Sequence, residues 1–363
     1  MKTVMLGLGV LAAGVLVLAA ALVASNRALD DDVASATPAM DHSTMSAAAG
    51  TSSKGGLQSF AGITADHATE LAKAHEPFPA TLPPVPAGDV VKVHMVLKDV
   101  TIEIAPGVQY QAWGFEGGAP GPVVHARQGQ TVEMTLTNGG AIPHSIDFHA
   151  ARIAPNEAFV DVMPGKSFTF RFKADDPGVF MYHCGTKPVL AHIANGMYGA
   201  IVVDPVPALP KVEREYVLVA GEWYLSNDGV AQPAQLDMNK ARAMMPDWTA
   251  FNGYAAQYVA HPLTANPGDT VRFYVVDAGP SLTTAFHVVG TIFDTVYPNG
   301  DMSPEHVMNG VQTVDVPAGG GAVFEVKIDE PGLYPFVSHA FAHVDLGQVG
   351  LLKVGSPKGT MSH

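Results

Sequence analysis

Short runs of alternating apolar and polar residues cover most of the chain between residues 88 and 356. The runs are rich in Val, Thr, Phe and Tyr, and Gly and Pro separate them. Apolar residues at helical spacing are scarce. This pattern is typical of antiparallel β-structure, so we expect an all-β fold.

The pattern occurs twice. In the first half, PGPVVHARQGQTVEMTLTN is followed by PHSIDFH, by a run ending in YHC and by GMYGAIVVDP. In the second half, HPLTANPGDTVRFYVVD is followed by AFHVVG, by a run ending in VSH and by LGQVGLLKVG. The shared order predicts two copies of one β-sandwich, which we place at residues 88–205 and 211–356 with a Pro-rich connection between them.

The first 87 residues lack this pattern. The uncharged, apolar run at 3–26 predicts that residues 1–28 are a signal peptide or a membrane anchor. Residues 29–87 read as a disordered, low-complexity linker and a Pro-rich lead-in, with a short helix at 63–74. We therefore expect an exported protein, periplasmic or otherwise extracytoplasmic, with a possible membrane tether at 3–26.

Two further features of composition limit the range of possible partners and of possible disulfide bonds. The formal net charge of −14 argues against nucleic acid and against an anionic membrane surface as partners, since both require a basic patch. A single cysteine excludes an internal disulfide framework. We interpret the Met- and His-containing segments 40–45 and 361–363 as polar tails.

The single cysteine lies in a stretch, 143–197, that is rich in metal ligands. His144, Cys184, His192 and Met197 follow one another there. Two imidazoles, a thiolate and a weak thioether are the ligand set of a blue-copper site. The sequence therefore predicts such a site in the first domain.

Strand alternation divides the remaining ligands of this stretch. If residues 143–149 form a strand, His144 shares the core face with its apolar neighbours, whereas Ser145, Asp147 and His149 face the other way. In YHC, adjacent side chains also point to opposite faces of the strand. If Cys184 points into the domain, His183 therefore points outward.

Two metal sites are thus expected back to back, joined by the peptide between His183 and Cys184. The outer site has only two histidines, so another surface must complete it. The second copy has no cysteine and no Met in its closing loop, but it keeps His287 and His339. We infer that it completes such an outer site. We interpret His343 as a residue supporting the site or lying at the surface.

Five motifs in order, PHSIDFH, YHC, HIANGM, FNG and the SH of the second domain, give the chain a family resemblance over residues 90–355. The chain resembles the copper-containing nitrite reductases, which are homotrimers of two-cupredoxin subunits. The resemblance implies two tandem cupredoxin-like Greek-key β-sandwich domains.

The resemblance also implies two copper ions per subunit. The implied ligands are His144, Cys184, His192 and Met197 for a type 1 copper, and His149, His183 and a neighbouring subunit's His339 for a type 2 copper. Asp147 and His287 are the implied catalytic residues.

The implied reaction is the one-electron reduction of nitrite to nitric oxide and water, as in denitrification. The electron would come from a cytochrome c or a cupredoxin and pass through Cys184 and His183. Two alternatives remain open. A two-domain multicopper oxidase would need several His-X-His pairs, of which the sequence has none. A non-catalytic cupredoxin electron carrier would need only the type 1 site.

Overall fold

The computed structural model describes residues 67–357. The predicted signal or anchor, the linker up to residue 66 and both polar tails lie outside the described residues. Of the helix expected at 63–74, the described part is α2 (Ala68–Ala74). Within residues 67–357, no helix is both long enough and apolar enough to span a membrane.

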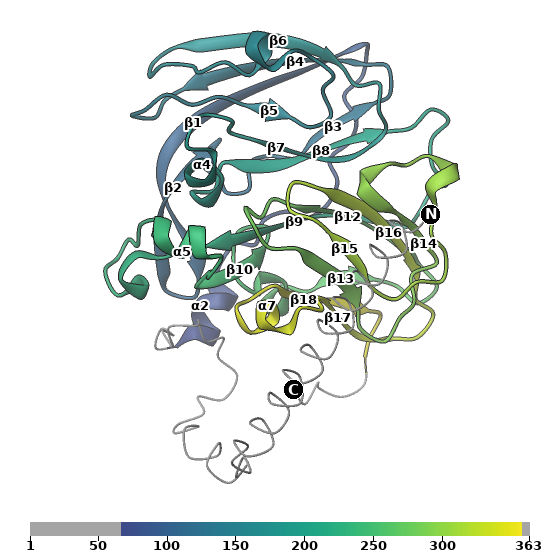
Figure 1. Cartoon of the computed structure of the whole chain (residues 1–363). Coiled ribbons are helices and arrows are strands. Elements are labelled where there is room, and N and C mark those ends of the chain that lie inside the picture. Colours follow the sequence, from purple (N-terminus) through teal and green to yellow (C-terminus); the bar gives the residue numbers. More distant parts are fainter. Residues whose placement is uncertain (1–66, 358–363) are drawn as a thin grey trace, which may run out of the picture. The chain divides into compact units, whose positions relative to one another are not determined.

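The first half of the described chain folds into a β-sandwich of two four-stranded sheets (Figure 1). One sheet has the order β2-β1-β4-β6 and the other β3-β8-β7-β5. The strands are β1 (Val90–Ala105), β2 (Val108–Phe115), β3 (Val124–Arg127), β4 (Thr131–Asn138), β5 (Asp147–Phe148), β6 (Ser167–Lys173), β7 (Gly178–His183) and β8 (Tyr198–Asp204).

The second half forms a sandwich of two five-stranded sheets, with the orders β10-β9-β12-β16-β14 and β11-β18-β17-β13-β15. Its strands are β9 (Arg214–Trp223), β10 (Trp248–Phe251), β11 (Leu263–Ala265), β12 (Thr270–Asp277), β13 (Thr284–Val288), β14 (Thr295–Tyr297), β15 (Val314–Val316), β16 (Gly321–Lys327), β17 (Gly332–Ser338) and β18 (Val349–Val354). The expected all-β fold of two tandem sandwiches is confirmed.

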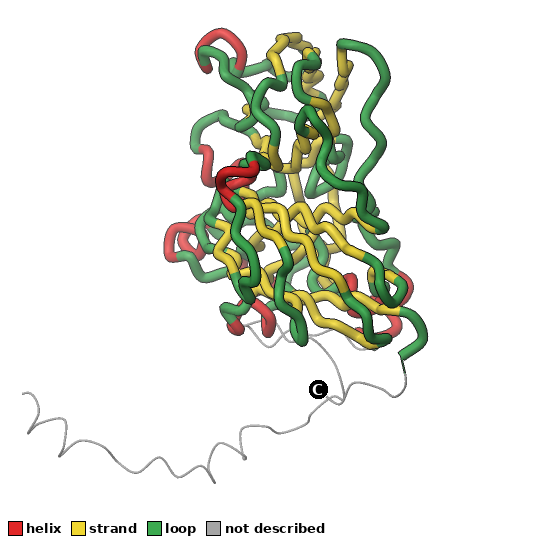
Figure 2. The backbone as a smooth tube through the Cα atoms, turned by 90° about the vertical axis from the view of Figure 1, so that its right-hand side faces the viewer, coloured by secondary structure: helices red, strands yellow, loops and turns green. Residues whose placement is uncertain are grey.

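Helices are short and lie in the connections between strands (Figure 2). The α-helices after α2 are α3 (Pro155–Ala158), α4 (Val189–Ala194), α5 (Met238–Ala243), α6 (Gln257–Ala260) and α7 (Phe341–Asp345). The 3-10 helices are η1 (Ser226–Gly229), η2 (Pro298–Gly300) and η3 (Pro304–His306). Two of these connections, containing α4 and α7, matter for the site.

Strand alternation builds the core of each sandwich. In β4, every second residue is buried, and Val132, Met134 and Leu136 turn toward the facing sheet. Phe170 of β6 and Phe148 of β5 meet them in the same core. Burial of such side chains contributes about 25 cal/mol per Å² of apolar surface, so this face fixes the register of the sheet.

The two sandwiches pack on each other through β7 and β8. Residues Tyr198–Val203 of β8 are all buried, because one face packs on the first core and the other on the second sandwich. The backbones approach so closely that a Cβ on Gly178 would lie 2.0 Å from the Gly300 carbonyl oxygen. The start of β7 is therefore held against the second sandwich, and the same strand carries His183 at its other end.

Candidate metal centres

The inner group of ligands lies between the two sheets of the first sandwich. His144 precedes β5, Cys184 directly follows β7, His192 lies in α4 and Met197 directly precedes β8. The exposed fractions of their side chains are 2 % or less. The fold thus brings together residues that are more than 50 positions apart in the sequence.

The potential ligand atoms of this group converge. The Nδ1 atoms of His144 and His192 are 3.1 Å apart. Cys184 Sγ lies 3.2 Å from His192 Nδ1 and 3.9 Å from His144 Nδ1. Met197 is tied to the same group by its backbone, since its carbonyl accepts from Cys184 N–H at 3.1 Å and its N–H donates to His192 O at 3.2 Å.

The electrostatics of the inner group suit a soft metal ion. Burial lowers the pKa of His144 to about 4, and burial also lowers the pKa of His192, so both imidazoles are neutral and can act as ligands. Burial raises the pKa of the Cys184 thiol. A bound cation would offset that penalty on the thiolate, and thiolate with imidazole is a donor set that copper favours.

Two supporting residues of the inner group escaped the sequence reasoning. Ser145 N–H donates to Cys184 Sγ at 3.3 Å, and Ser145 itself is fully buried. The expectation that Ser145 faces outward is wrong, because regular strand is confined to Asp147–Phe148. Trp113 packs against His144 and His192, with ring centroids 5.3 and 4.9 Å apart. No short motif marks Trp113, whereas Ser145 lies within PHSIDFH, where strand alternation assigns it to the wrong face.

The outer group consists of Asp147, His149 and His183. Asp147 and His183 are paired across β5 and β7. Asp147 Oδ2 lies 4.0 Å from His183 Nε2, which in turn lies 3.1 Å from His149 Nε2. The ligand atoms of these three residues all lie within 4.8 Å of one another.

Hydrogen bonds orient both imidazoles of the outer group. His149 Nδ1 donates to Gly319 O at 2.9 Å, and His183 Nδ1 donates to Cys184 O at 2.9 Å. With the protons placed on Nδ1, the two Nε2 atoms face each other as lone pairs, an arrangement that a shared cation stabilises. Burial is the main cause that lowers the pKa of His183, and the neighbouring His149 lowers it further. The lowered pKa favours the neutral imidazole.

The two histidines of the second sandwich lie apart from the outer group within one chain. Among residues 67–357, neither joins a cluster of three potential His, Cys, Asp or Glu ligands. The rings of His287 and His339 lie beside each other, 5.5 Å apart, and His339 is exposed. His287 Nδ1 donates to Gln312 O at 2.6 Å. Completion of an outer site by His339 of another subunit stays a prediction.

Comparison with known proteins places this arrangement in a family. Models of the multicopper oxidase family match residues 96–208 and 229–358. The chain is 42% identical over 270 residues to the copper-containing nitrite reductase of Neisseria gonorrhoeae, covering 73% of this chain and 68% of that protein. It is 43% identical over 275 residues to the enzyme of the same name from Neisseria meningitidis serogroup B, covering 74% and 69%.

A solved structure agrees with the sequence relatives. The copper nitrite reductase from Nitrosomonas europaea superposes with a TM-score of 0.68 at 36% identity, covering 74% of this chain and 94% of that one. The two-sandwich fold is therefore cupredoxin-like. On these similarities, the chain belongs to the copper-containing nitrite reductase family.

Proposed function

We propose that this protein is a copper-dependent nitrite reductase, an oxidoreductase that converts nitrite to nitric oxide and water with one electron. The observation that carries the proposal is the pair of ligand clusters that meet at consecutive residues. Cys184 belongs to the inner cluster and His183 to the outer one. One cluster can receive an electron and the other can bind the substrate, with one peptide bond between them.

The residues divide between two copper ions per subunit. His144, Cys184, His192 and Met197 hold a type 1 copper; His149 and His183, with His339 of a neighbouring subunit, hold a type 2 copper. Copper, when bound, supplies the one-electron redox chemistry at both clusters and a Lewis-acid position for nitrite at the outer one. The chain keeps the inner ligands buried, while His149 of the outer cluster is exposed and the His183 side chain is 12 % exposed.

The reaction also consumes two protons, and we assign their delivery to Asp147 and His287. The Asp147 side chain is 30 % exposed, so it can exchange protons with solvent, and it lies 4.0 Å from His183 Nε2. It can hydrogen-bond to a molecule held at that atom. His287 lies beside His339, so a neighbour that contributes His339 brings its own His287 to the same site. With Nδ1 bonded to Gln312, Nε2 of His287 remains free to carry a proton.

The assembly we propose is a homotrimer in which each outer cluster lies between two subunits. Support comes from an exposed apolar side chain beside His339. Phe341 is 54 % exposed and packs against the His339 ring at 4.8 Å. An exposed aromatic residue next to a ligand suits a surface that a partner covers.

We place the enzyme outside the cytoplasm, in the periplasm or an equivalent compartment, where it would serve denitrification. The uncharged run at 3–26 supports export and a possible membrane tether. The electron donor is a cytochrome c or a cupredoxin, and the net charge of −14 suits a donor with a basic docking surface.

The multicopper oxidase is the second candidate because the matching family models carry that description. A trinuclear copper cluster would need several His-X-His pairs, and the sequence has none. A simple electron carrier would leave the arrangement of Asp147, His149 and His183 without a purpose.

Copper content and electron paramagnetic resonance (EPR) of the purified protein, together with nitrite turnover, test the proposal. We expect two coppers per chain, one of each type, and nitric oxide as the product. Four coppers per chain would indicate the oxidase, and one copper without turnover would indicate the carrier.

A further inference from the structure

A frame of backbone hydrogen bonds surrounds the inner cluster of the first sandwich. Cys184 N–H donates to Met197 O at 3.1 Å, and Met197 N–H donates to His192 O at 3.2 Å. Ser145 N–H donates to Cys184 Sγ at 3.3 Å. These bonds tie the end of β7, the start of β8 and the residue after His144 into one unit.

The second sandwich repeats the same frame around different side chains. Ser338 N–H donates to Gln348 O at 3.3 Å, and Gln348 N–H donates to His343 O at 2.8 Å. Ala285 N–H donates to Ser338 Oγ at 3.2 Å. Each bond has its counterpart in the first sandwich, which fixes the structural equivalence residue by residue.

Four polar residues therefore stand where the first sandwich has its inner ligands. Thr284 replaces His144, Ser338 replaces Cys184, His343 replaces His192, and Gln348 replaces Met197. We call these four residues the polar cradle. Hydrogen bonds join them: Gln348 Nε2 donates to Thr284 Oγ1 at 2.8 Å, and Ser338 Oγ lies 3.3 Å from His343 Nδ1.

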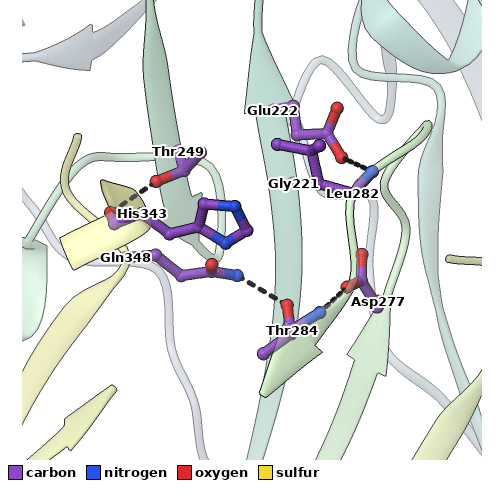
Figure 3. Close-up of a pocket in the computed structure, with 8 residues that line it drawn as sticks. All are labelled: Gly221, Glu222, Thr249, Asp277, Leu282, Thr284, His343 and Gln348. Carbon is purple, nitrogen blue, oxygen red and sulfur yellow. Dashed lines mark hydrogen bonds between the residues drawn. The ribbon is translucent and has the colours of Figure 1, made fainter. Parts of the chain in front are cut away.

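Three residues of the polar cradle, Thr284, His343 and Gln348, border a cavity of about 10 Å³. Figure 3 shows His343 and Gln348 on one side of this cavity and the carboxylates of Glu222 and Asp277 on the other. A space of this size accommodates about one water molecule. Hydrogen bonds between these side chains join the strands here.

One of these hydrogen bonds closes the loop that carries His339. Ser338 and His343 flank residues 339–342, and their side chains meet across the loop at 3.3 Å. In the first sandwich, the equivalent atoms, Cys184 Sγ and His192 Nδ1, are 3.2 Å apart and belong to the candidate copper site.

The Ser338 hydroxyl is also linked to His339 through Ala285. It accepts the Ala285 N–H, and the Ala285 carbonyl accepts the His339 N–H at 2.6 Å. The His339 backbone is thus held both by the closed loop and by the neighbouring strand.

We propose that Ser338 and His343 are positioning residues, which hold the loop so that His339 is presented to the neighbouring subunit as a copper ligand. This inference rests on the proposed function, because it assumes that His339 binds the type 2 copper. In this loop, the hydrogen bond between Ser338 and His343 makes the link that a metal would make between Cys184 and His192 in the first sandwich. A ligand fixed before the subunits meet loses less conformational freedom when it binds.

Ser338→Ala and His343→Leu remove the closure, and His343→Asn keeps a polar atom near the position of Nδ1. Ser303→Ala is a matched control, because Ser303 Oγ and His306 Nδ1 are also 3.3 Å apart but lie in an exposed turn. Hydrogen–deuterium exchange of the metal-free protein is the first measurement. We expect faster exchange at residues 339–345 in Ser338→Ala and His343→Leu, and unchanged exchange there in Ser303→Ala.

Copper binding is the second measurement. We expect type 2 copper affinity to fall by about 10- to 100-fold in Ser338→Ala and His343→Leu, with type 1 absorption unchanged and with substantial recovery in His343→Asn. Unchanged loop exchange, unchanged type 2 affinity or a parallel loss of both coppers would overturn the inference. If the unmodified protein bound no type 2 copper, the proposed function would fail, and the exchange data alone would decide whether the closure exists.

Discussion

His183 and Cys184 are consecutive residues whose side chains enter different clusters. Cys184 Sγ lies 3.2 Å from His192 Nδ1, while His183 Nε2 lies 3.1 Å from His149 Nε2. The His183 Nδ1–H also donates to the Cys184 carbonyl at 2.9 Å, which adds a second link between the two residues. An electron that enters the inner cluster therefore has a short, bonded route to the outer one.

Replacement of Asp147 by Asn tests the proton relay. The amide has nearly the shape of the carboxylate but cannot take up and release a proton near neutral pH. We expect steady-state nitrite turnover to fall by about 10²- to 10⁴-fold, with both coppers bound and the type 1 absorption unchanged. Asp329→Asn, at a side chain that is 72 % exposed, is the control and should retain full turnover. Full activity in Asp147→Asn would remove this residue from the relay.

Replacement of Cys184 by Ser tests whether the inner cluster receives the electron and the outer cluster carries out catalysis. The hydroxyl is a poor ligand for copper, so the inner cluster should lose its copper and its blue colour. The outer ligands remain, and we expect one copper per chain with an EPR spectrum of type 2 alone. Turnover with an electron-donor protein should be lost. Retained donor-driven turnover would show that electrons reach the outer cluster by another route.

The stability of the metal-free protein should depend on pH through His144. Burial lowers the pKa of His144 from 6.5 to about 4, so between these values the unfolded chain binds a proton that the folded chain does not. The free energy of unfolding should therefore fall as pH drops from 6.5 to 4, by at most about 3 kcal/mol from this residue. Urea unfolding at several pH values measures it. In His144→Gln the decline should be smaller; an equal decline would assign the effect to other groups.

Strand alternation and motif spacing were sufficient to predict most of the first domain. They separated Cys184 from His183 correctly because β7 is regular up to His183. They failed at Ser145, because the chain before β5 is held by an isolated bridge between His144 and Val162 rather than by a continuous ladder. Side chains alternate between the two faces of a sheet only where the hydrogen bonds between strands continue without interruption.

The second domain was less predictable from its sequence. His343 had no visible relation to His192, because the loop after Ser338 is shorter than the loop after Cys184 and the other three positions have changed residue type. Only the hydrogen-bond frame around Gln348 and Ser338 reveals the equivalence. The proposed role of His339 between subunits depends on a surface that no single chain contains.

Mixed assembly of two inactive variants tests most directly the claim that the catalytic copper is shared between subunits. His149→Ala damages one side of the site and His339→Ala the other, and each variant alone should lack type 2 copper and nitrite turnover. After unfolding and refolding together, a His339→Ala subunit would supply His149 and His183 while its His149→Ala neighbour supplies His339. We predict that type 2 EPR signal and turnover return in the mixture. No recovery in verified mixed oligomers, or full activity in either variant alone, would contradict the account.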